Sequence, residues 1–283
     1  APTIGPDDVL VTCDDGLTMV PALTPDERLD DPDDTRAELL GTPVYILDAK
    51  EQTEITCDRV LYNGLQQRFD LLADEPDHTV VLRDPRLLAR SSHMWIAPER
   101  GLGGFVESGS ITVREEQATP YANPAIPASA NAALTLDDAA STDPPRSTLD
   151  ITWTEGVDIQ FDSSDESDDP SIQSIVFKGD VDVISPYGVF SSDWMRMNFA
   201  KDGSGKAVPS RLLDREQVRA HNDDQTIWAD DLEVTFMVDE NAQADTGPDD
   251  AERSSLIGEG TEVKDVFANG DVQVLMDDGA RVF

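Results

Sequence analysis

Apolar and polar residues alternate along this chain in a pattern that predicts β-strands joined by turns. A strand–turn–strand unit recurs four times, with first arms at residues 44–46, 80–82, 181–183 and 272–274, and a turn signal follows each arm. One hairpin cannot bury its apolar face alone, so it must pack against a neighbour. The recurrence therefore predicts hairpins stacked on one another.

The second arm of the unit carries an inserted residue. Three copies share this feature, at residues 55–62, 190–197 and 227–234. Each copy places apolar side chains at i, i+2, i+5 and i+7, with an aspartate at the interruption (Asp58, Asp193 and Asp230). A flat strand would keep its apolar residues at i, i+2 and i+4. The insertion predicts a bulge or bend that keeps one face apolar, and we expect each aspartate to cap backbone amides.

Stacked bends predict an all-β fold with little helix. We expect an open, bent antiparallel β-jelly-roll or a β-solenoid of strand–turn–strand repeats. The best helix signal, in residues 24–40, is a capping box of Thr24 and Glu27 that Pro32 interrupts, so we expect one short helical turn there. Residues 201–217 are predicted to be an irregular connection with weak helical character.

Composition divides the chain into two β-repeat blocks. Residues 1–117 form the first block and residues 149–283 form the second, and the intervening residues 118–148 are rich in proline and alanine. The intervening segment is either a linker between two blocks or a long loop from one continuous sheet. The second block stops at Phe283 inside an apolar strand pattern, so we expect the chain to be truncated there, as a mature form or an excised segment.

The predicted bends leave one concave apolar wall, which forms a trough. Its expected lining is Val60, Tyr62, Met195, Met197, Phe199, Leu232, Val234 and Phe236. One interpretation of these side chains is a packed core. The other is a slot for acyl chains, in which the methionines provide an adaptable lipid surface.

Charge restricts the partners of this protein. The net charge is −37, from 58 acidic and 21 basic residues. A nucleic-acid partner needs a basic surface and an anionic membrane surface would repel this chain, so neither is expected. The acidity is typical of a protein that stays soluble in a salty medium. No apolar stretch approaches the roughly 20 residues of a membrane-spanning helix, so we expect no transmembrane span.

Two cysteines, Cys13 and Cys57, occupy matching Thr-Cys-Asp triplets. We interpret them as small core residues at equivalent positions, a slot that Ser192 and Ala229 fill elsewhere. A disulfide between them is the alternative if their strands stack in an oxidising compartment. The three histidines are scattered and no C-x-x-C motif is present, so we expect no metal or cofactor site.

Catalytic motifs are missing from the sequence. It has no G-x-S-x-G, no H-E-x-x-H and no phosphate-binding loop. The glycines at 101–104 follow a strand without opening a helix, which indicates a turn. His93 is interpreted as a surface or core histidine. We therefore expect a protein without enzymatic activity.

Three segments carry a resemblance to a known family. Residues 177–183 (FKGDVDV), 225–234 (QTIWADDLEV) and 269–274 (NGDVQV) resemble the motifs of the OstA-like family. That family includes the periplasmic proteins LptA and LptC and the N-terminal domain of LptD. The resemblance covers residues 41–113 loosely and residues 175–283 better.

The resemblance implies a periplasmic, open β-jelly-roll along whose trough the acyl chains of lipopolysaccharide pass. It also implies edge-strand stacking with other OstA-like jelly-rolls. The expected function is thus a non-enzymatic, lipid-binding β-jelly-roll whose partner is lipopolysaccharide or another acylated lipid. The residues leave two alternatives open. One is a structural repeat or scaffold protein of the cell envelope, and the other is a carbohydrate-binding jelly-roll with Trp153, Trp194 and Trp228 exposed on an outer face.

Overall fold

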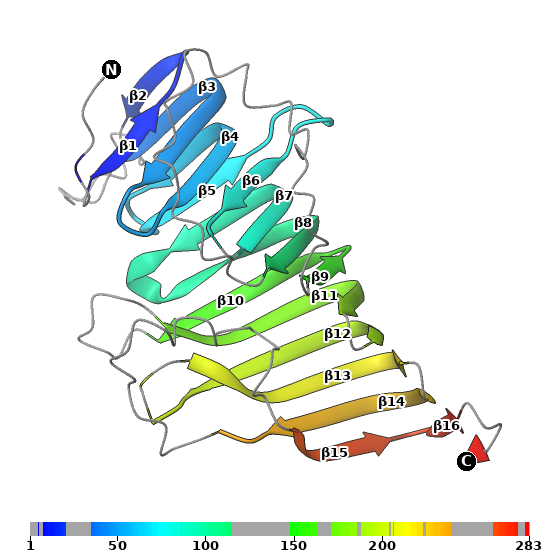
Figure 1. The fold of residues 1–283 in the computed structure, drawn as a ribbon. Coiled ribbons are helices and arrows are strands. Elements are labelled where there is room, and N and C mark those ends of the chain that lie inside the picture. Colours follow the sequence, from blue (N-terminus) through cyan, green and yellow to red (C-terminus); the bar gives the residue numbers. More distant parts are fainter. Residues whose placement is uncertain are drawn as a thin grey trace, which may run out of the picture.

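The computed structural model describes residues 5, 8–20, 35–85, 87–114, 148–162, 171–185, 188–203, 205, 207–222, 225–238, 263–276 and 281–282. They are almost entirely β-strand, as the sequence predicts (Figure 1). The strands are β1 (Val9–Thr12), β2 (Gly16–Val20), β3 (Arg36–Asp48), β4 (Thr53–Asn63), β5 (Arg68–Leu72), β6 (Val80–Arg83), β7 (Leu87–Ala97), β8 (Leu102–Arg114), β9 (Thr148–Trp153), β10 (Gly156–Asp162), β11 (Ser171–Ser185), β12 (Gly188–Lys201), β13 (Ala207–His221), β14 (Gln225–Phe236), β15 (Val263–Asn269), β16 (Gln273–Met276) and β17 (Arg281–Val282). A 3₁₀ turn, η1 (Pro98–Arg100), joins β7 to β8.

All seventeen strands belong to one antiparallel sheet. Pairs of short strands that lie end to end are inserted between groups of long strands. The long strand β3 pairs with both β1 and β2, β4 and β7 enclose β5 and β6, and β14 pairs with both β15 and β16. The long strand β8 pairs with both β9 and β10, so hydrogen bonds join the two repeat blocks directly.

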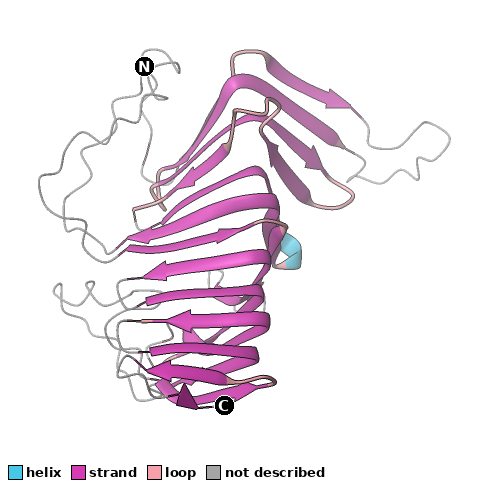
Figure 2. Ribbon diagram, turned by 90° about the vertical axis from the view of Figure 1, so that its right-hand side faces the viewer, coloured by secondary structure: helices cyan, strands magenta, loops and turns pink. Residues whose placement is uncertain are grey.

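Each long strand bends where its pairing register shifts. Asp58, Asp193 and Asp230 are the residues that the ladders skip, so the predicted insertion at each aspartate is confirmed. The matching residues of other strands include Glu107, Asp180 and Glu216, whose φ angles of 67°, 38° and 63° are left-handed. That conformation is typical of the first residue of a bulge. Figure 2 shows the bends stacked along one side of the sheet, and we call this line the corner.

The corner divides the sheet into two walls. The first wall contains β2, β5, β10, β15 and the parts of the long strands bonded to them, and the second wall contains β1, β6, β9, β16, β17 and the remaining parts. The core lies between them, because one cluster of buried side chains joins Val60 and Phe177 of the first wall to Val44, Ile151 and Val181 of the second.

Trp153 lies at the centre of this core. Its indole ring is 5.3 Å from the ring of Phe105 and 5.7 Å from that of Phe177, and its Nε1 donates a hydrogen bond of 2.8 Å to the carbonyl oxygen of Glu107. A Cβ atom on Gly109 would meet the ring at 2.4 Å, so the glycine opposite makes room for it. The expectation that Trp153 lies on an outer face is therefore wrong.

Two local predictions are also wrong. Residues 207–221 form the strand β13, which replaces the irregular connection expected at 201–217. The alternation of apolar and polar residues was not visible in this segment of the sequence, because Asp214 occupies an inward-facing position where an apolar residue was expected. Residues 36–40, placed in the segment with the best helix signal, belong instead to β3, where they pair with β2 and β4. The capping box itself lies outside the described residues, as do residues 118–147 of the proline-rich segment.

The cysteines occupy the predicted core positions. Cys57 is buried, Cys13 packs against the same core cluster, and both thiols are free. Ser192 and Ala229, predicted for the same slot, are buried too. Burial, with a smaller contribution from the charge of Asp58, raises the pKa of the Cys57 thiol to about 12. In the part of the chain that the structure describes, no helix is long and apolar enough to cross a membrane.

Candidate functional site

The inner face of the first wall carries a continuous row of residues next to the corner, which we call the floor row. Each member pairs with the next across the sheet. From β3 to β15 the members are Leu39, Val60, Leu71, Met94, Phe105, Val157, Phe177, Met195, Asp214, Leu232 and Ala268. The nine members from Val60 to Leu232 are only 1% to 8% exposed. The part of the trough next to the corner is therefore a packed core.

A second row runs parallel to the floor row, two residues further from the corner on most strands. Its members, which again pair in sequence, are Ala37, Tyr62, Phe69, Ile96, Gly103, Ile159, Ile175, Met197, Leu212, Val234 and Val266. This row carries no charge. Phe69 and Ile96 are each 38% exposed, and most of the remaining apolar members are half-buried. Apolar surface thus remains accessible along the second row.

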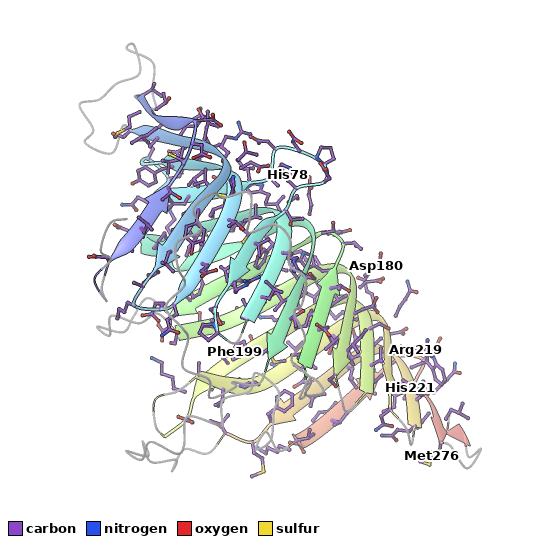
Figure 3. All side chains as sticks on the ribbon, turned by 45° about the horizontal axis from the view of Figure 1, so that its top comes forward. His78, Asp180, Phe199, Arg219, His221 and Met276 are labelled. Atoms are coloured by element: carbon purple, nitrogen blue, oxygen red, sulfur yellow. The ribbon has the colours of Figure 1, made fainter. Side chains whose placement is uncertain are left out.

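The predicted lining residues share this inner face but differ in depth. Val60, Met195 and Leu232 belong to the floor row, and Tyr62, Met197 and Val234 belong to the second row. Phe199 (labelled in Figure 3) and Phe236 lie further along β12 and β14, nearer the open side.

The structure brings six of these residues together on two strands that flank β13. In one line across them Met197 pairs with Leu212 and Leu212 with Val234. The other two predicted residues lie on β4, at the opposite end of the same row. Sequence reasoning missed Phe69 and Ile96, although the alternation of apolar residues in β5 and β7 was the signal for them.

One member of the floor row is an acid. Asp214 lies between Met195 and Leu232 and is 1% exposed. Its Oδ1 is 3.5 Å from the hydroxyl of Ser192, and its Oδ2 has no hydrogen-bond partner within the described residues. Burial raises the pKa of this carboxyl group to about 8, and the Ser192 hydroxyl opposes that shift. Asp214 is therefore mainly protonated at pH 7.

The aspartates at the corner hold backbone and side-chain amides. Asp58 accepts a hydrogen bond of 2.8 Å from the backbone N–H of Asp74, and Asp230 accepts one of 3.4 Å from that of Asp271. The predicted capping role is confirmed for these two. Asp193 differs, because it accepts a hydrogen bond of 3.3 Å from a glutamine side chain.

One described cluster has the donor atoms to hold a metal ion. The ligand atoms of Glu75, Asp77 and His78 lie within 4.8 Å of one another. His78 Nδ1 is already 2.9 Å from Asp58, and this hydrogen bond raises the pKa of the imidazole. The hydrogen bond between His78 and Asp58 explains the position of this loop without an ion. The pairing fastens the β5–β6 connection to the corner.

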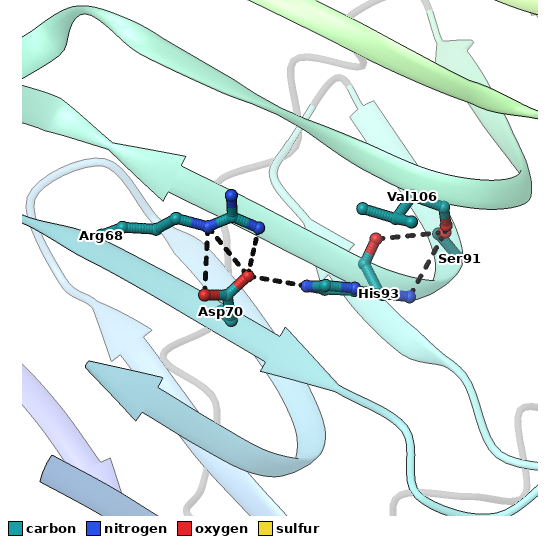
Figure 4. Close-up of polar contacts among 5 residues, drawn as sticks. All are labelled: Arg68, Asp70, Ser91, His93 and Val106. Atoms are coloured by element: carbon teal, nitrogen blue, oxygen red, sulfur yellow. Dashed lines mark hydrogen bonds and ion pairs between the residues drawn. The ribbon is translucent and has the colours of Figure 1, made fainter. Parts of the chain in front are cut away.

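The outer face of the first wall carries a group of polar side chains that pair with one another. Arg68 donates hydrogen bonds to Asp70, which is also 2.8 Å from His93 Nε2 (Figure 4). The Arg68 guanidinium lies 4.5 Å from the ring centre of Trp95. Next to the corner, a surface hollow of about 590 Å³ is lined by residues that include Trp194 and Arg215. The charges of Arg68 and Asp70 are therefore paired with each other.

The fold and the trough define a class of protein, an all-β, jelly-roll-like sheet bent around an apolar inner face. No family model, curated protein or solved structure matches this chain.

Proposed function

We propose that this protein is a non-enzymatic, lipid-binding β-jelly-roll of the periplasm or cell envelope, similar to the bridge proteins of lipopolysaccharide transport. The observation that carries the proposal is the second row, an uncharged strip that crosses eleven strands and keeps apolar side chains accessible. Lipopolysaccharide or another acylated lipid would lay its acyl chains along this strip.

The dimensions of the strip suit a long apolar ligand. Strands in a sheet are about 4.8 Å apart, so eleven of them span roughly 50 Å. Each methylene group that leaves water contributes about 0.8 kcal/mol, so a chain that contacts several strands gains enough to bind. The strip has no charged side chain to bury, which removes the main cost of such binding.

The two ends of the sheet support stacking with other jelly-rolls. At the first end, the inward-facing Leu17 and Met19 are 57% and 63% exposed, and at the last end Val263 and Val266 are 54% and 53% exposed. The apolar inner face thus runs out to both end strands. An added sheet would cover these side chains and extend the strip.

A matched pair of substitutions tests lipid binding. Val234 faces the trough, and its neighbour Thr235 faces outward. We expect Val234→Asp to weaken binding of a fluorescent fatty acid and of purified lipopolysaccharide by at least about tenfold, because a charge in the strip must be desolvated. Thr235→Asp should bind as the unchanged protein does. Equal binding by both variants, with normal circular dichroism, would refute the proposal.

Photocrosslinking locates the ligand directly. A photoreactive amino acid at Phe199, on the inner side of β12, should form an adduct with lipopolysaccharide. The same group at Asn198, which faces outward on that strand, should not. Adducts at both positions or at neither would contradict binding in the trough.

The packed floor row favours a second candidate, a structural repeat or scaffold protein of the cell envelope. A rigid spacer needs a closed core, and Phe177 and Leu232 are 2% and 5% exposed. This candidate predicts that no lipid binds to the unchanged protein. The carbohydrate-binding alternative has less support, because Trp153 is buried and the Arg215 guanidinium lies 5.3 Å from the Trp194 ring.

A further inference from the structure

Asp214 is the one ionisable side chain among the buried residues that the structure describes, apart from the Cys57 thiol. It interrupts a floor row that is otherwise apolar. Met195 of β12 and Leu232 of β14 flank it in the sheet, and the corner begins two residues further along β13, at Glu216. An acid at this depth has a cost unless it is neutral or paired.

A protonated carboxyl group of Asp214 fits the hydrogen bonds around it better than an ionised one does. The Ser192 hydroxyl lies 3.3 Å from the carbonyl oxygen of Trp194 and 3.5 Å from Asp214 Oδ1. A protonated carboxyl can donate to the Ser192 oxygen while Ser192 donates to the carbonyl. An ionised carboxylate would compete with that carbonyl for the single hydroxyl hydrogen, and its Oδ2 would have no donor within the described residues.

No described charge compensates for ionisation of Asp214. The inward-facing side chains around it are uncharged: Ser192 and Met195 of β12, Leu212 and Val218 of β13, and Ala229 and Leu232 of β14. The charged side chains of these strands next to it lie at the corner or on the outer face: Asp193, Arg215, Glu216, Asp230, Asp231 and Glu233. The guanidinium of Arg215 lies over the ring of Trp194, on the outer face of the sheet. Among the described residues, Ser192 is therefore the one side chain that hydrogen-bonds to the acid.

We propose that Asp214 is a proton-operated latch for the part of the trough formed by β12, β13 and β14. While the carboxyl group carries its proton, the first-wall parts of these strands pack against the second wall and exclude water. Loss of the proton admits water between the walls at this point, because the carboxylate must be hydrated. The latch depends on the packing of the protein alone and holds whether or not a lipid binds.

The latch makes local opening depend steeply on pH. The packed carboxyl group has a pKa of about 8, whereas a hydrated aspartate has a pKa of about 3.9. The opening equilibrium should therefore rise about tenfold for each pH unit between about pH 4 and pH 8, and become level above that range.

Hydrogen exchange measured by mass spectrometry tests the latch. We expect the protection factors of β12–β14 amides, corrected for the intrinsic pH dependence of exchange, to fall about tenfold per unit between pH 5 and pH 8. The slope should vanish in Asp214→Asn, which keeps the shape and stays neutral. It should persist in the matched control Asp231→Asn, an outward-facing acid one strand away. The same slope in Asp214→Asn, or an equal slope in β3–β8, would overturn the latch.

A spectroscopic measurement keeps the proposal testable if Asp214→Asn fails to fold. In the unchanged protein labelled with carbon-13 at aspartate carboxyl groups, infrared spectra should show one protonated carboxyl that persists through pH 7 and titrates near pH 8. Its absence at pH 6 would overturn the proposal. Both measurements use lipid-free protein, so they can fail independently of lipid binding.

Discussion

The floor row and the second row run side by side on the same strands, yet they have different environments. Phe177 in the floor row is 2% exposed, whereas Phe69 in the second row is 38% exposed. Both are inward-facing phenylalanines in regular antiparallel pairs. A separation of two residues along a strand is only about 7 Å. Between these two phenylalanines the distance from the corner distinguishes a packed core from an accessible apolar surface, whereas on β12 and β14 Met197 and Phe236 stay buried, at 6% and 8% exposed.

The comparison teaches that this bent sheet can combine two roles. Near the corner the second wall covers the first, and the floor row gains the close packing that stabilises the fold. Towards the open side the second row keeps part of its surface in contact with solvent. A scaffold role needs the first property, and a lipid-binding role needs the second.

The largest expected effect is on the free energy of unfolding, and it comes from truncating a side chain of the floor row rather than one of the second row. We expect Phe177→Ala to lower the free energy of unfolding by about 3–5 kcal/mol, since it leaves a cavity in the floor. Phe69→Ala should cost less than about 2 kcal/mol, because its side chain is already partly exposed. Urea denaturation of both variants at one pH checks this. Equal losses would show that the rows are not distinct.

The next effect concerns the acid in the floor row. The pKa of Asp214 is raised on folding to about 8, so its contribution to stability is complete below about pH 4 and is lost as pH rises to 8. The loss is about 1.4 kcal/mol per pH unit, or roughly 3 kcal/mol between pH 5 and pH 7. The difference in unfolding free energy between the unchanged protein and Asp214→Asn should follow this slope. A difference that does not vary with pH would mean that Asp214 is hydrated.

A smaller effect tests how tightly the second wall closes on the floor. A Cβ atom on Gly109 would meet Trp153 at 2.4 Å and the carbonyl oxygen of Arg90 at 2.5 Å. We expect Gly109→Ala to destabilise the protein by about 1–3 kcal/mol, because neither neighbour can move freely. Thermal unfolding should show this loss, and Ser110→Ala, on the outer side of the same strand, provides the control. An unchanged melting temperature in Gly109→Ala would indicate a loose core.

The smallest expected effect on stability comes from removing an ion pair on the outer face. Arg211 donates two hydrogen bonds, of 2.7 and 2.8 Å, to the carboxylate of Glu233, which raises the pKa of Arg211 and lowers that of Glu233. Both side chains contact solvent, which weakens the pair. We expect Arg211→Ala to change urea unfolding very little, and any change should disappear in concentrated salt. A loss of unfolding free energy comparable to that of Phe177→Ala would contradict the conclusion that packing on the inner face stabilises the fold.

The bends could be predicted because each inserted aspartate shifts the alternation of its neighbours by one position. The depth of a residue could not be predicted, since alternation identifies a face and not the distance to the opposite wall. Val60 and Tyr62 looked equivalent in the sequence, but only Val60 is buried.

The strand β13 was missed for a related reason. Its inward positions include Asp214, and its outward positions include Arg211 and Arg215, so the apolar pattern is weak. Partners on β12 and β14, rather than local sequence, hold it in the sheet. Like Phe69 and Ile96, this acid is a part of the candidate site that sequence reasoning did not find, because only the folded protein shows that it is buried.

The bends have an electrical consequence. Six bends of the long strands place an acid on the corner, and so do three connections between short strands: Asp58, Glu107, Asp180, Asp193, Glu216 and Asp230, and Asp74, Glu155 and Asp271. Strands are spaced about 4.8 Å apart, whereas the screening length of water is about 8 Å at 0.15 M salt and about 3 Å at 1 M. In dilute buffer these carboxylates repel as one line of charge. In brine each is shielded from the next, so the repulsion that opposes the hydrogen-bonded stack at the corner falls as the ionic strength of the medium rises.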